Sequence, residues 1–208
     1  MNLRALPRVL LLCPALLAFQ DPTPSPATQP AAQAPVGGGE TQRTLEESLR
    51  LAQPGPEHAW LAQLVGEHEV VLRSRARASD AWAERKGTCT ASKLLGGRYV
   101  QLAMRFPASG PEAEGFEVLQ VLGHDRLRRA YTSSWRDTLT TWDVVSSGGM
   151  TEPGLVRFQG VSADPQFVDG RVFRMDLAVP GSGAPSLRVF TGTAGAEEEL
   201  VHLEFRRA

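Results

Sequence analysis

The chain has 208 residues, of which 42% are hydrophobic and 22% are charged, and this length fits one domain with an appended segment. The 22 Lys and Arg residues nearly balance the 23 Asp and Glu residues, which excludes an overall basic field that would attract nucleic acid. We therefore expect no nucleic-acid partner.

Residues 1–20 have the pattern of a secretory signal. Arg4 and Arg8 supply positive charge, and the apolar stretch over residues 9–19 that follows is too short to span a bilayer. Cys13 follows three leucines, but Leu12 occupies the position where lipid attachment needs a small residue, so we do not expect a lipid anchor. The sequence thus predicts an exported protein, periplasmic or secreted, with no transmembrane span in the mature chain.

Residues 21–55 have the composition of a flexible linker. Pro, Ala, Gln, Thr and Gly dominate residues 21–39, with almost no large apolar side chain to offset the entropy of ordering. Thr44 and Glu47 have the spacing of a capping box, which predicts a short helix after Thr44. Removal of the signal leaves Cys89 as the remaining cysteine, which excludes an intramolecular disulfide and a metal site built on several thiolates.

Residues 56–208 are predicted to form a single barrel domain. At its start, Trp60, Leu61, Leu64 and Val65 have helical spacing and Gly66 follows them, which predicts a short helix over residues 56–66 that plugs or flanks a sheet. Beyond this helix the periodicity changes from that of a helix to that of strands.

The clearest strand follows the diglycine at residues 96–97. Val100, Leu102, Met104 and Phe106 alternate with more polar residues, as in a strand with one buried face. Similar runs recur, and turn chemistry separates most of them; the Asp-Gly pair at residues 169–170 is typical of a hairpin turn. Strand-like runs cover residues 68–78, 81–91, 98–106, 115–122, 129–135, 138–146, 155–161, 172–179, 187–191 and 199–206.

Sequential strands without long amphipathic helices between them favour an antiparallel meander that closes on itself over a parallel α/β sheet. We therefore predict an all-β fold, an antiparallel up-and-down barrel of about eight to ten strands with a short N-terminal helix. A parallel sheet would need helical crossovers, and the sequence shows no pattern for them.

A set of motifs extends over residues 60–206. It comprises Leu61, Leu64 and Gly66, Gly87 with Thr88, the Leu-Leu-Gly-Gly-Arg segment ending at Arg98, Gly115 with Phe116, Gly-His-Asp at residues 123–125 and Trp-Arg-Asp at residues 135–137. In this combination the chain resembles a widespread bacterial domain-of-unknown-function family whose members are described as lipocalin-like or calycin-like. The resemblance implies a barrel and no established activity. The chain departs from the family pattern at His68, where Trp is common, and at His124, where Tyr is usual.

Three common catalytic or phosphate-binding motifs are absent from the sequence. The sequence lacks a Gly-x-Ser-x-Gly nucleophile motif, a His-Glu-x-x-His pair and a phosphate-binding Gly-x-x-x-x-Gly-Lys loop. The candidate ligand-binding residues are aromatic with a few polar groups, as in small-molecule pockets; they are Arg98, Tyr131, Trp135, Asp137 and Trp142. In the competing interpretation the tryptophans pack the core, and Arg98 pairs with Asp137 to close a barrel end.

The four histidines, His58, His68, His124 and His202, lie far apart in the sequence, so no local spacing brings two of them onto one metal ion. His202 alternates with apolar residues and lies on the polar face of the last strand. If that face lines the barrel, His202 is a candidate cofactor-binding residue, an axial ligand to haem as in small nitrobindin-like barrels. If that face is outside, His202 is solvated.

Three functions remain open at this point. The first is a non-catalytic barrel, without a cofactor, that holds a small hydrophobic or amphipathic ligand in its interior; an interior filled by side chains would count against it. The second is a haem- or metal-binding barrel that uses His202 in redox or isomerase-type chemistry. The third is a solid-core structural or partner-binding domain, in which Arg73, Arg75 and Arg77 on one strand face meet an acidic partner.

Overall fold

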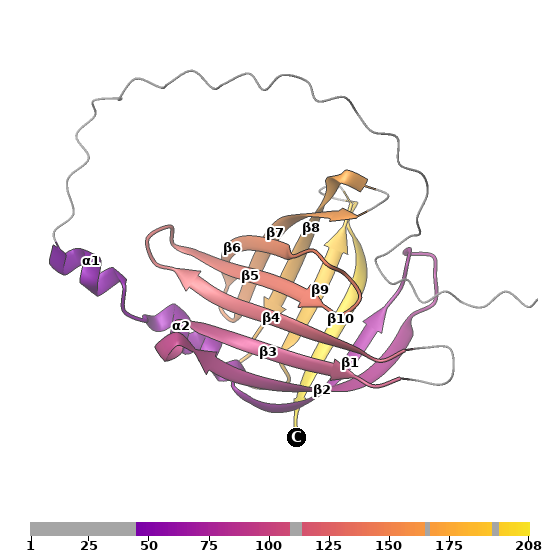
Figure 1. The fold of residues 1–208 in the computed structure, drawn as a ribbon, viewed down its shortest axis with the longest axis horizontal. Helices are drawn as coiled ribbons and strands as arrows, with labels where there is room; N and C mark the ends of the chain where they lie inside the picture. The colour runs from indigo at the N-terminus through magenta and orange to yellow at the C-terminus, as the bar shows by residue number, and fades with distance from the viewer. Residues whose placement is uncertain (1–44, 109–113, 165–166, 193–195) are drawn as a thin grey trace, which may run out of the picture.

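The computed structural model describes residues 45–108, 114–164, 167–192 and 196–208. In this part of the chain, antiparallel strands follow one another around a closed ten-stranded barrel (Figure 1). The first strand, β1 (Gly66–Ser74), pairs with the last, β10 (Glu198–Arg207), and closes the ring. The predicted all-β, up-and-down barrel is therefore confirmed. The other strands are β2 (Ala83–Leu94), β3 (Tyr99–Phe106), β4 (Phe116–Asp125), β5 (Ala130–Asp137), β6 (Val144–Glu152), β7 (Leu155–Asp164), β8 (Phe167–Ala178) and β9 (Ser186–Thr191).

Short helices precede the barrel. They are α1 (Leu45–Leu51), α2 (Pro56–Leu61) and the 3-10 turn η1 (Ala62–Leu64). Pro56 begins α2, where its fixed φ suits the first helical position and no amide proton is needed. The helix expected over residues 56–66 is shorter, since α2 ends at Leu61 and η1 follows it. Gly66, with φ of 142°, begins β1 instead of capping the helix. The diglycine at residues 96–97 forms the turn η2 (Leu95–Gly97), with φ of 69° and 85°.

Strand alternation separates an inner from an outer face of the barrel. Val100, Leu102, Met104 and Phe106 of β3 are 1–2% exposed and point into the barrel, as the alternation predicts. Burial of a side chain of this size contributes about 1.5–3 kcal/mol relative to leaving it in water. The inner face of the ring is therefore the hydrophobic core of the protein.

Several strand boundaries differ from the sequence prediction, and two of the differences concern residues that the sequence analysis discussed or placed in a candidate site. β1 ends at Ser74, so Arg75 and Arg77 lie beyond the strand and do not share its face with Arg73. β6 begins at Val144 and not at residue 138, because Asp137 Oδ1 accepts hydrogen bonds from the amides of Leu139 and Thr140, both at 2.9 Å, and turns the chain.

Two glycine-containing pairs lie inside strands. The pair at residues 148–149 belongs to β6, where a Cβ on Gly148 would lie 1.8 Å from the carbonyl oxygen of Arg157 in β7. The hairpin turn predicted at residues 169–170 is wrong, since the pair belongs to β8. Gly170 has φ of 88° and faces the register shift between Ser162 and Asp164, so its backbone freedom serves an irregular strand pairing and not a turn.

The barrel has two ends. At the helix end, β1 begins and α2 packs against β3 and β4, with η1 next to it (Figure 1). At the loop end, on the opposite side, β1, β3, β5, β7 and β9 end, and no described helix covers the strands. No described helix is both long enough and apolar enough to cross a membrane.

Candidate functional site

The helix end is sealed. Leu61 of α2 and Leu64 of η1 are each 1% exposed and join the core of the barrel. His68 of β1 is 3% exposed, and its Nε2 donates to the carbonyl oxygen of Leu64 at 2.7 Å. The ring of Trp60 packs edge-on against Tyr131 of β5, with 5.4 Å between centroids. Together these contacts fix α2 and η1 on the strands.

The central layer of the barrel is filled by side chains. Leu122, Phe158 and Leu203 come from three different strands and are each 0% exposed. A cavity large enough for a water molecule would leave part of the surrounding side chains accessible, and these three side chains have no accessible surface. A ligand in the centre of the barrel, as the sequence analysis considered, would therefore have to displace core residues.

One polar pair lies within this filled layer. Gln120 of β4 is 0% exposed, and its Nε2 donates to Ser133 Oγ at 3.0 Å and to Met175 Sδ at 3.7 Å. Its Oε1 has no hydrogen-bond partner among the described residues. An unpaired buried amide oxygen is destabilising by roughly 1–3 kcal/mol, which marks this pair as a weak point of the core.

Exposure of the inner face increases toward the loop end. Along β8, the exposed fraction rises from 0% at Leu177 to 5% at Met175 and 7% at Phe173. The apolar side chains that are partly buried and packed on the core at this end are Leu72, Phe116, Trp135, Val144 and Val189. Trp135 and Val144 are direct partners across β5 and β6. The loop end therefore presents an apolar surface that the described residues do not fully cover.

Trp135 is held by a polar partner at the rim of this surface. Its Nε1 donates to Asp137 Oδ2 at 2.9 Å, while the other oxygen of Asp137 accepts the two amides of the turn after β5. Asp137 is thus fully used in fixing the indole ring and the β5–β6 connection. The ring face of Trp135, and not its N–H, is what a ligand could contact.

The predicted ligand-binding residues divide between the two ends. Trp135 and Asp137 lie at the loop end, and Trp142, which is half-buried, lies in the connection just beyond them. Tyr131 is 4% exposed and lies at the helix end. Arg98 belongs to the turn before β3, also at the helix end, where its Nη1 donates to the carbonyl oxygen of Leu95 at 3.1 Å. One site cannot contain all five, and the considered pairing of Arg98 with Asp137 does not occur.

His202 lies on the outer wall of the barrel. Its strand neighbour Leu203 is 0% exposed and points inward, so His202 points outward, where its Nδ1 lies 3.7 Å from Glu199 Oε1. Burial, then the charge of Arg188, lowers the pKa of His202 below its ordinary value of 6.5. The haem hypothesis required this face to line the barrel, so His202 is not positioned to ligate a group inside it.

A cluster of ionisable side chains joins α2 to β4. We name Glu57, His58 and His124 the Glu-His cluster, since one ligand atom from each lies within 4.8 Å of the others. The rings of His58 and His124 meet edge-on, with 5.8 Å between centroids. No local sequence spacing brings two histidines together, as the sequence analysis stated. The packing of α2 on the barrel nevertheless places His58 and His124 side by side. Only the packing of α2 on β4 reveals the cluster, because residues 57 and 124 are linked by no sequence pattern.

Burial controls the charge of this cluster. Burial and, to a smaller degree, the nearby His124 lower the pKa of His58 below its ordinary value of 6.5. Burial also lowers the pKa of His124, although Glu57 acts in the opposite direction. Burial, with a smaller contribution from Glu57, raises the pKa of Tyr131 to about 12. At neutral pH both imidazoles are therefore uncharged and the phenol is protonated.

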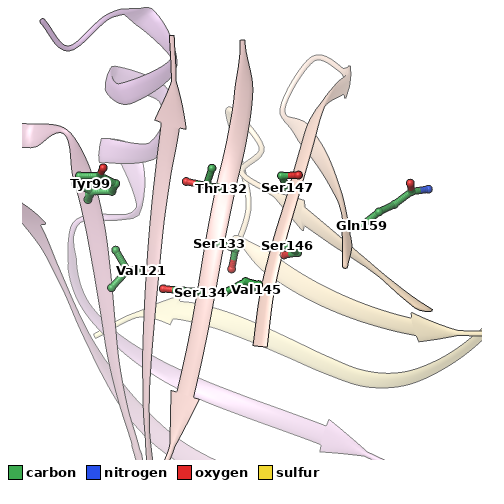
Figure 2. Close-up of a pocket in the computed structure, with 9 residues that line it drawn as sticks. All are labelled: Tyr99, Val121, Thr132, Ser133, Ser134, Val145, Ser146, Ser147 and Gln159. Carbon is green, nitrogen blue, oxygen red and sulfur yellow. The ribbon is translucent and has the colours of Figure 1, made fainter. Parts of the chain in front are cut away.

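Two grooves lie on the outer wall. The groove in Figure 2 has a volume of about 420 Å³ and crosses β3 to β7. Its lining is Tyr99, Val121, Thr132, Ser133, Ser134, Val145, Ser146, Ser147 and Gln159. A second groove of about 600 Å³ lies beside the exposed ion pair of Arg105 with Glu117 (2.7 Å). Both are open, and neither brings together titratable groups with shifted pKa values, so neither has the features of a catalytic centre.

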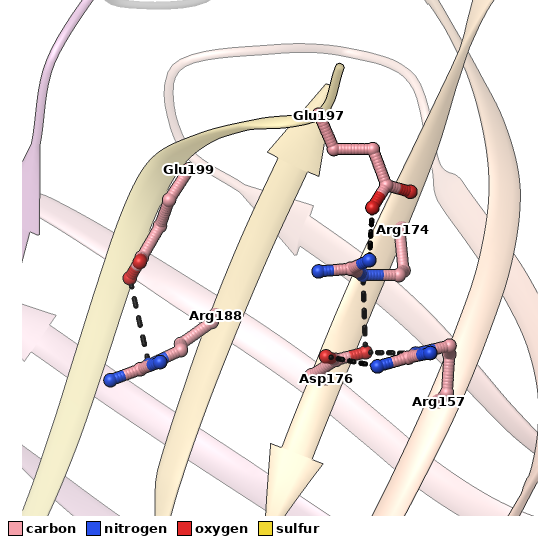
Figure 3. A network of polar contacts seen from close by, with 6 residues as sticks. All are labelled: Arg157, Arg174, Asp176, Arg188, Glu197 and Glu199. Atoms are coloured by element: carbon pink, nitrogen blue, oxygen red, sulfur yellow. Dashed lines mark hydrogen bonds and ion pairs between the residues drawn. The ribbon is translucent and has the colours of Figure 1, made fainter. Parts of the chain in front are cut away.

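Ion pairs cross the outer wall of β7 to β10 (Figure 3). Arg157 of β7 binds Asp176 of β8 through two hydrogen bonds of 3.0 and 3.1 Å. Arg174 contacts Asp176 at 3.4 Å and also pairs with Glu197, while its guanidinium lies 3.9 Å from the ring centroid of Phe190. Arg157 with Asp176, and Arg188 with Glu199, join neighbouring strands, which fits a structural role in strand pairing.

Comparison with known families identifies the family of this chain. A family model described as "Protein of unknown function (DUF1579)" matches residues 53–207. Because the match covers most of the chain, the protein belongs to this family. The expected membership in a domain-of-unknown-function family is thus confirmed, while the match says nothing of lipocalin kinship or of the Leu-Leu-Gly-Gly-Arg segment. A search of the curated proteins found no match.

Proposed function

We propose that this protein is an exported, non-catalytic, lipocalin-like barrel that binds a small hydrophobic or amphipathic ligand at its loop end. The observation that supports this function is the gradient of exposure along the inner face. Along β8 the exposed fraction rises from 0% at Leu177 to 7% at Phe173, and most of the partly buried apolar side chains that pack on the core lie at the loop end. Small-molecule sites are concave and mostly apolar, and barrel ends commonly provide them.

The ligand would lie across the loop end and not in the centre of the barrel. Leu72, Val144 and Val189 would contact its apolar part, together with the ring face of Trp135. Each Å² of apolar surface removed from water contributes about 25 cal/mol, so a contact of this kind suits an alkyl chain or a small ring. The filled central layer limits how deeply such a molecule can enter.

Arg85 favours an amphipathic ligand with an anionic group. It occupies the inward register of β2 near this end, since Cys89, four residues further along the strand, is buried in the core. Its guanidinium lies 5.5 Å from the ring centroid of Phe116, and its Nη1 donates to the carbonyl oxygen of Glu114 at 2.9 Å. The remaining donors of Arg85 would be available to a carboxylate at the rim.

A binding assay with a matched pair of variants tests the site. The probes are the fluorescent dye anilinonaphthalene sulfonate and dodecanoate as its competitor. Val144 faces the loop end, whereas Val145, its neighbour on β6, is 57% exposed on the outer wall and lines the groove of Figure 2. We expect Val144→Asp to weaken dye binding at least tenfold and Val145→Asp to leave it unchanged, because a carboxylate would oppose only an occupant of the loop end.

Each other outcome contradicts the proposed site. Loss of binding in Val145→Asp alone would place the ligand in the outer groove. Absence of dye and dodecanoate binding to the unsubstituted protein would favour a solid-core structural domain. Circular dichroism of both variants checks that the barrel has folded before the binding constants are compared.

Export is tested on the full chain. Residues 1–20 lie outside the described residues, and their charge and hydropathy pattern supports the proposal. Cys89, the cysteine that would remain after removal of the signal, is 0% exposed, which suits an oxidising compartment because a buried thiol does not cross-link. We expect a bacterial host to release a shortened chain whose N-terminus lies near residue 20. A full-length cytoplasmic product would contradict export.

A further inference from the structure

The Glu-His cluster at the helix end contains two buried atoms without partners. Glu57 Oε2 and His124 Nδ1 each have no hydrogen-bond partner among the described residues. The His124 side chain is 7% exposed, so water does not readily satisfy its nitrogen. The two atoms are 3.9 Å apart, which is too far for a hydrogen bond between them. Buried polar atoms are almost always paired, so this arrangement calls for an occupant.

The spacing and chemistry of these atoms fit a divalent metal ion. Metal–nitrogen and metal–oxygen bonds of about 2.0–2.2 Å in a tetrahedral site separate two ligand atoms by roughly 3.3 Å, slightly less than the gap here. Two imidazoles with one carboxylate form a ligand set that zinc and similar ions prefer, whereas Mg²⁺ and Ca²⁺ prefer oxygen ligands. We propose that Glu57, His58 and His124 bind one Zn²⁺-class ion that connects α2 to β4.

His58 is the ligand that must rearrange. Its Nδ1 accepts the amide of Gly55 at 3.0 Å. Metal binding would replace the Gly55 contact at Nδ1. Loss of one such hydrogen bond weakens binding by about tenfold, which a three-ligand zinc site tolerates.

The surrounding charges set the affinity and leave a position open. The Glu57 side chain is 37% exposed, so a water molecule can complete the coordination from the solvent side. Arg126 lies close enough to lower the pKa of both imidazoles, and its Nη1 is held by the carbonyl oxygens of Arg50 and Gln53 at 2.8 and 3.0 Å. Its charge opposes a cation, whereas Asp125, which raises the pKa of His124, favours one. An ion at this site would lock α2, and with it the seal of the helix end.

Zinc binding to the chelator-treated protein tests the site. We expect native mass spectrometry to show one Zn²⁺ per chain and calorimetry to give a 1:1 stoichiometry, with an increase of the melting temperature that grows with zinc concentration. Glu57→Gln and His124→Phe should each weaken binding at least tenfold. Mg²⁺ should not bind. Co²⁺ should give the intense visible absorption of a four-coordinate site with nitrogen and oxygen ligands.

The outer wall provides a matched control. Glu199 and His202 form a similar pair with 3.7 Å between Oε1 and Nδ1, but they are 23% and 21% exposed and Arg188 neighbours the carboxylate at 3.6 Å. Glu199→Gln and His202→Gln should leave zinc binding unchanged. The proposal is overturned if the unsubstituted protein binds no zinc, or if these outer variants lose binding while Glu57→Gln retains it. Glu57→Gln keeps the size of the side chain, so its result stands even if His124→Phe does not fold.

Discussion

The two ends of the barrel are built from similar apolar strands but differ in how they are completed. At the helix end, Leu61 and Leu64 extend the core beyond the strands and leave 1% of each side chain exposed. At the loop end, Trp135 and Val144 are only partly buried against the same core. A barrel fold therefore does not by itself determine where a ligand can bind. The segments that precede or connect the strands decide which end is sealed.

The largest expected effect contrasts a leucine at each end. Leu64→Ala should lower the free energy of unfolding by about 3 kcal/mol, because it leaves a cavity in a sealed site. Leu72→Ala removes the same atoms from a partly exposed site and should lower it by about 1 kcal/mol. Urea denaturation of both variants measures the difference. Equal losses would show that the loop end is as well covered in solution as the helix end.

A smaller contrast concerns the polar bond at each end. His68→Leu removes the donor to the Leu64 carbonyl and leaves that oxygen buried and unpaired, so it should lower the free energy of unfolding by about 2 kcal/mol. Trp135→Phe removes the donor to Asp137, whose other oxygen keeps its two amide bonds at 2.9 Å, and should lower it by less than about 1 kcal/mol. Thermal unfolding in the presence of a chelator ranks the two variants. The reverse order would mean that the loop end depends more on its polar anchor than on apolar contacts.

The helix end should also respond to acid. Burial holds the pKa values of His58 and His124 below 6.5 in the folded protein. At a pH between 6.5 and these lower values, the unfolded chain therefore binds more protons than the folded protein. The free energy of unfolding should therefore decrease as the pH falls below 6.5 and level off once the folded histidines are also protonated. In His124→Phe the slope of this decrease should be smaller. A chelator keeps metal out of the measurement, and an unchanged slope in the variant would show that His124 is not buried in its neutral form.

The smallest effect concerns local opening, which the reactivity of a buried thiol reports. Cys89 lies beside His68 in the barrel wall, and burial, with a smaller contribution from Glu67, raises the pKa of its thiol to about 12. The folded protein should react with a thiol reagent at pH 8 only through rare opening, whereas the protein in urea should react at once. Trp135→Phe should not alter the folded rate, while His68→Leu should increase it. Rapid reaction of the unsubstituted protein would mean that the helix end opens frequently.

Alternation predicted the inner face of β3 correctly, because a half-buried strand repeats every second residue whatever its neighbours are. Turn positions were less predictable. Glycine is favoured both in hairpin turns and where strands approach closely, so the sequence does not distinguish Gly148, which faces the backbone of β7, from a turn glycine.

The sequence does not show how far apart two candidate residues lie in the folded barrel. Tyr131, Trp135 and Asp137 were grouped because they combine aromatic rings with a polar group, and they do share the inward register of β5. At about 3.3 Å per residue, six residues cover roughly 20 Å, which is enough to place them at opposite ends of the barrel. Conversely, Glu57 and His124 share no periodicity at all, and only the docking of α2 onto β4 brings them together.

The pairing of β1 with β10 has a consequence for the order of events during synthesis and folding. Each of these strands presents unpaired backbone groups until the other arrives, and the register from His68 with Arg207 to Ser74 with Val201 joins the first strand of the ring to the last. The ring therefore cannot close on the ribosome before β10 has emerged, and contacts this distant in sequence form slowly. Late closure would suit the proposed export, because an open chain can pass through a membrane in an extended form. It also exposes two strand edges during that time, so chaperone protection of the nascent chain should matter more for this protein than its stability after folding would suggest.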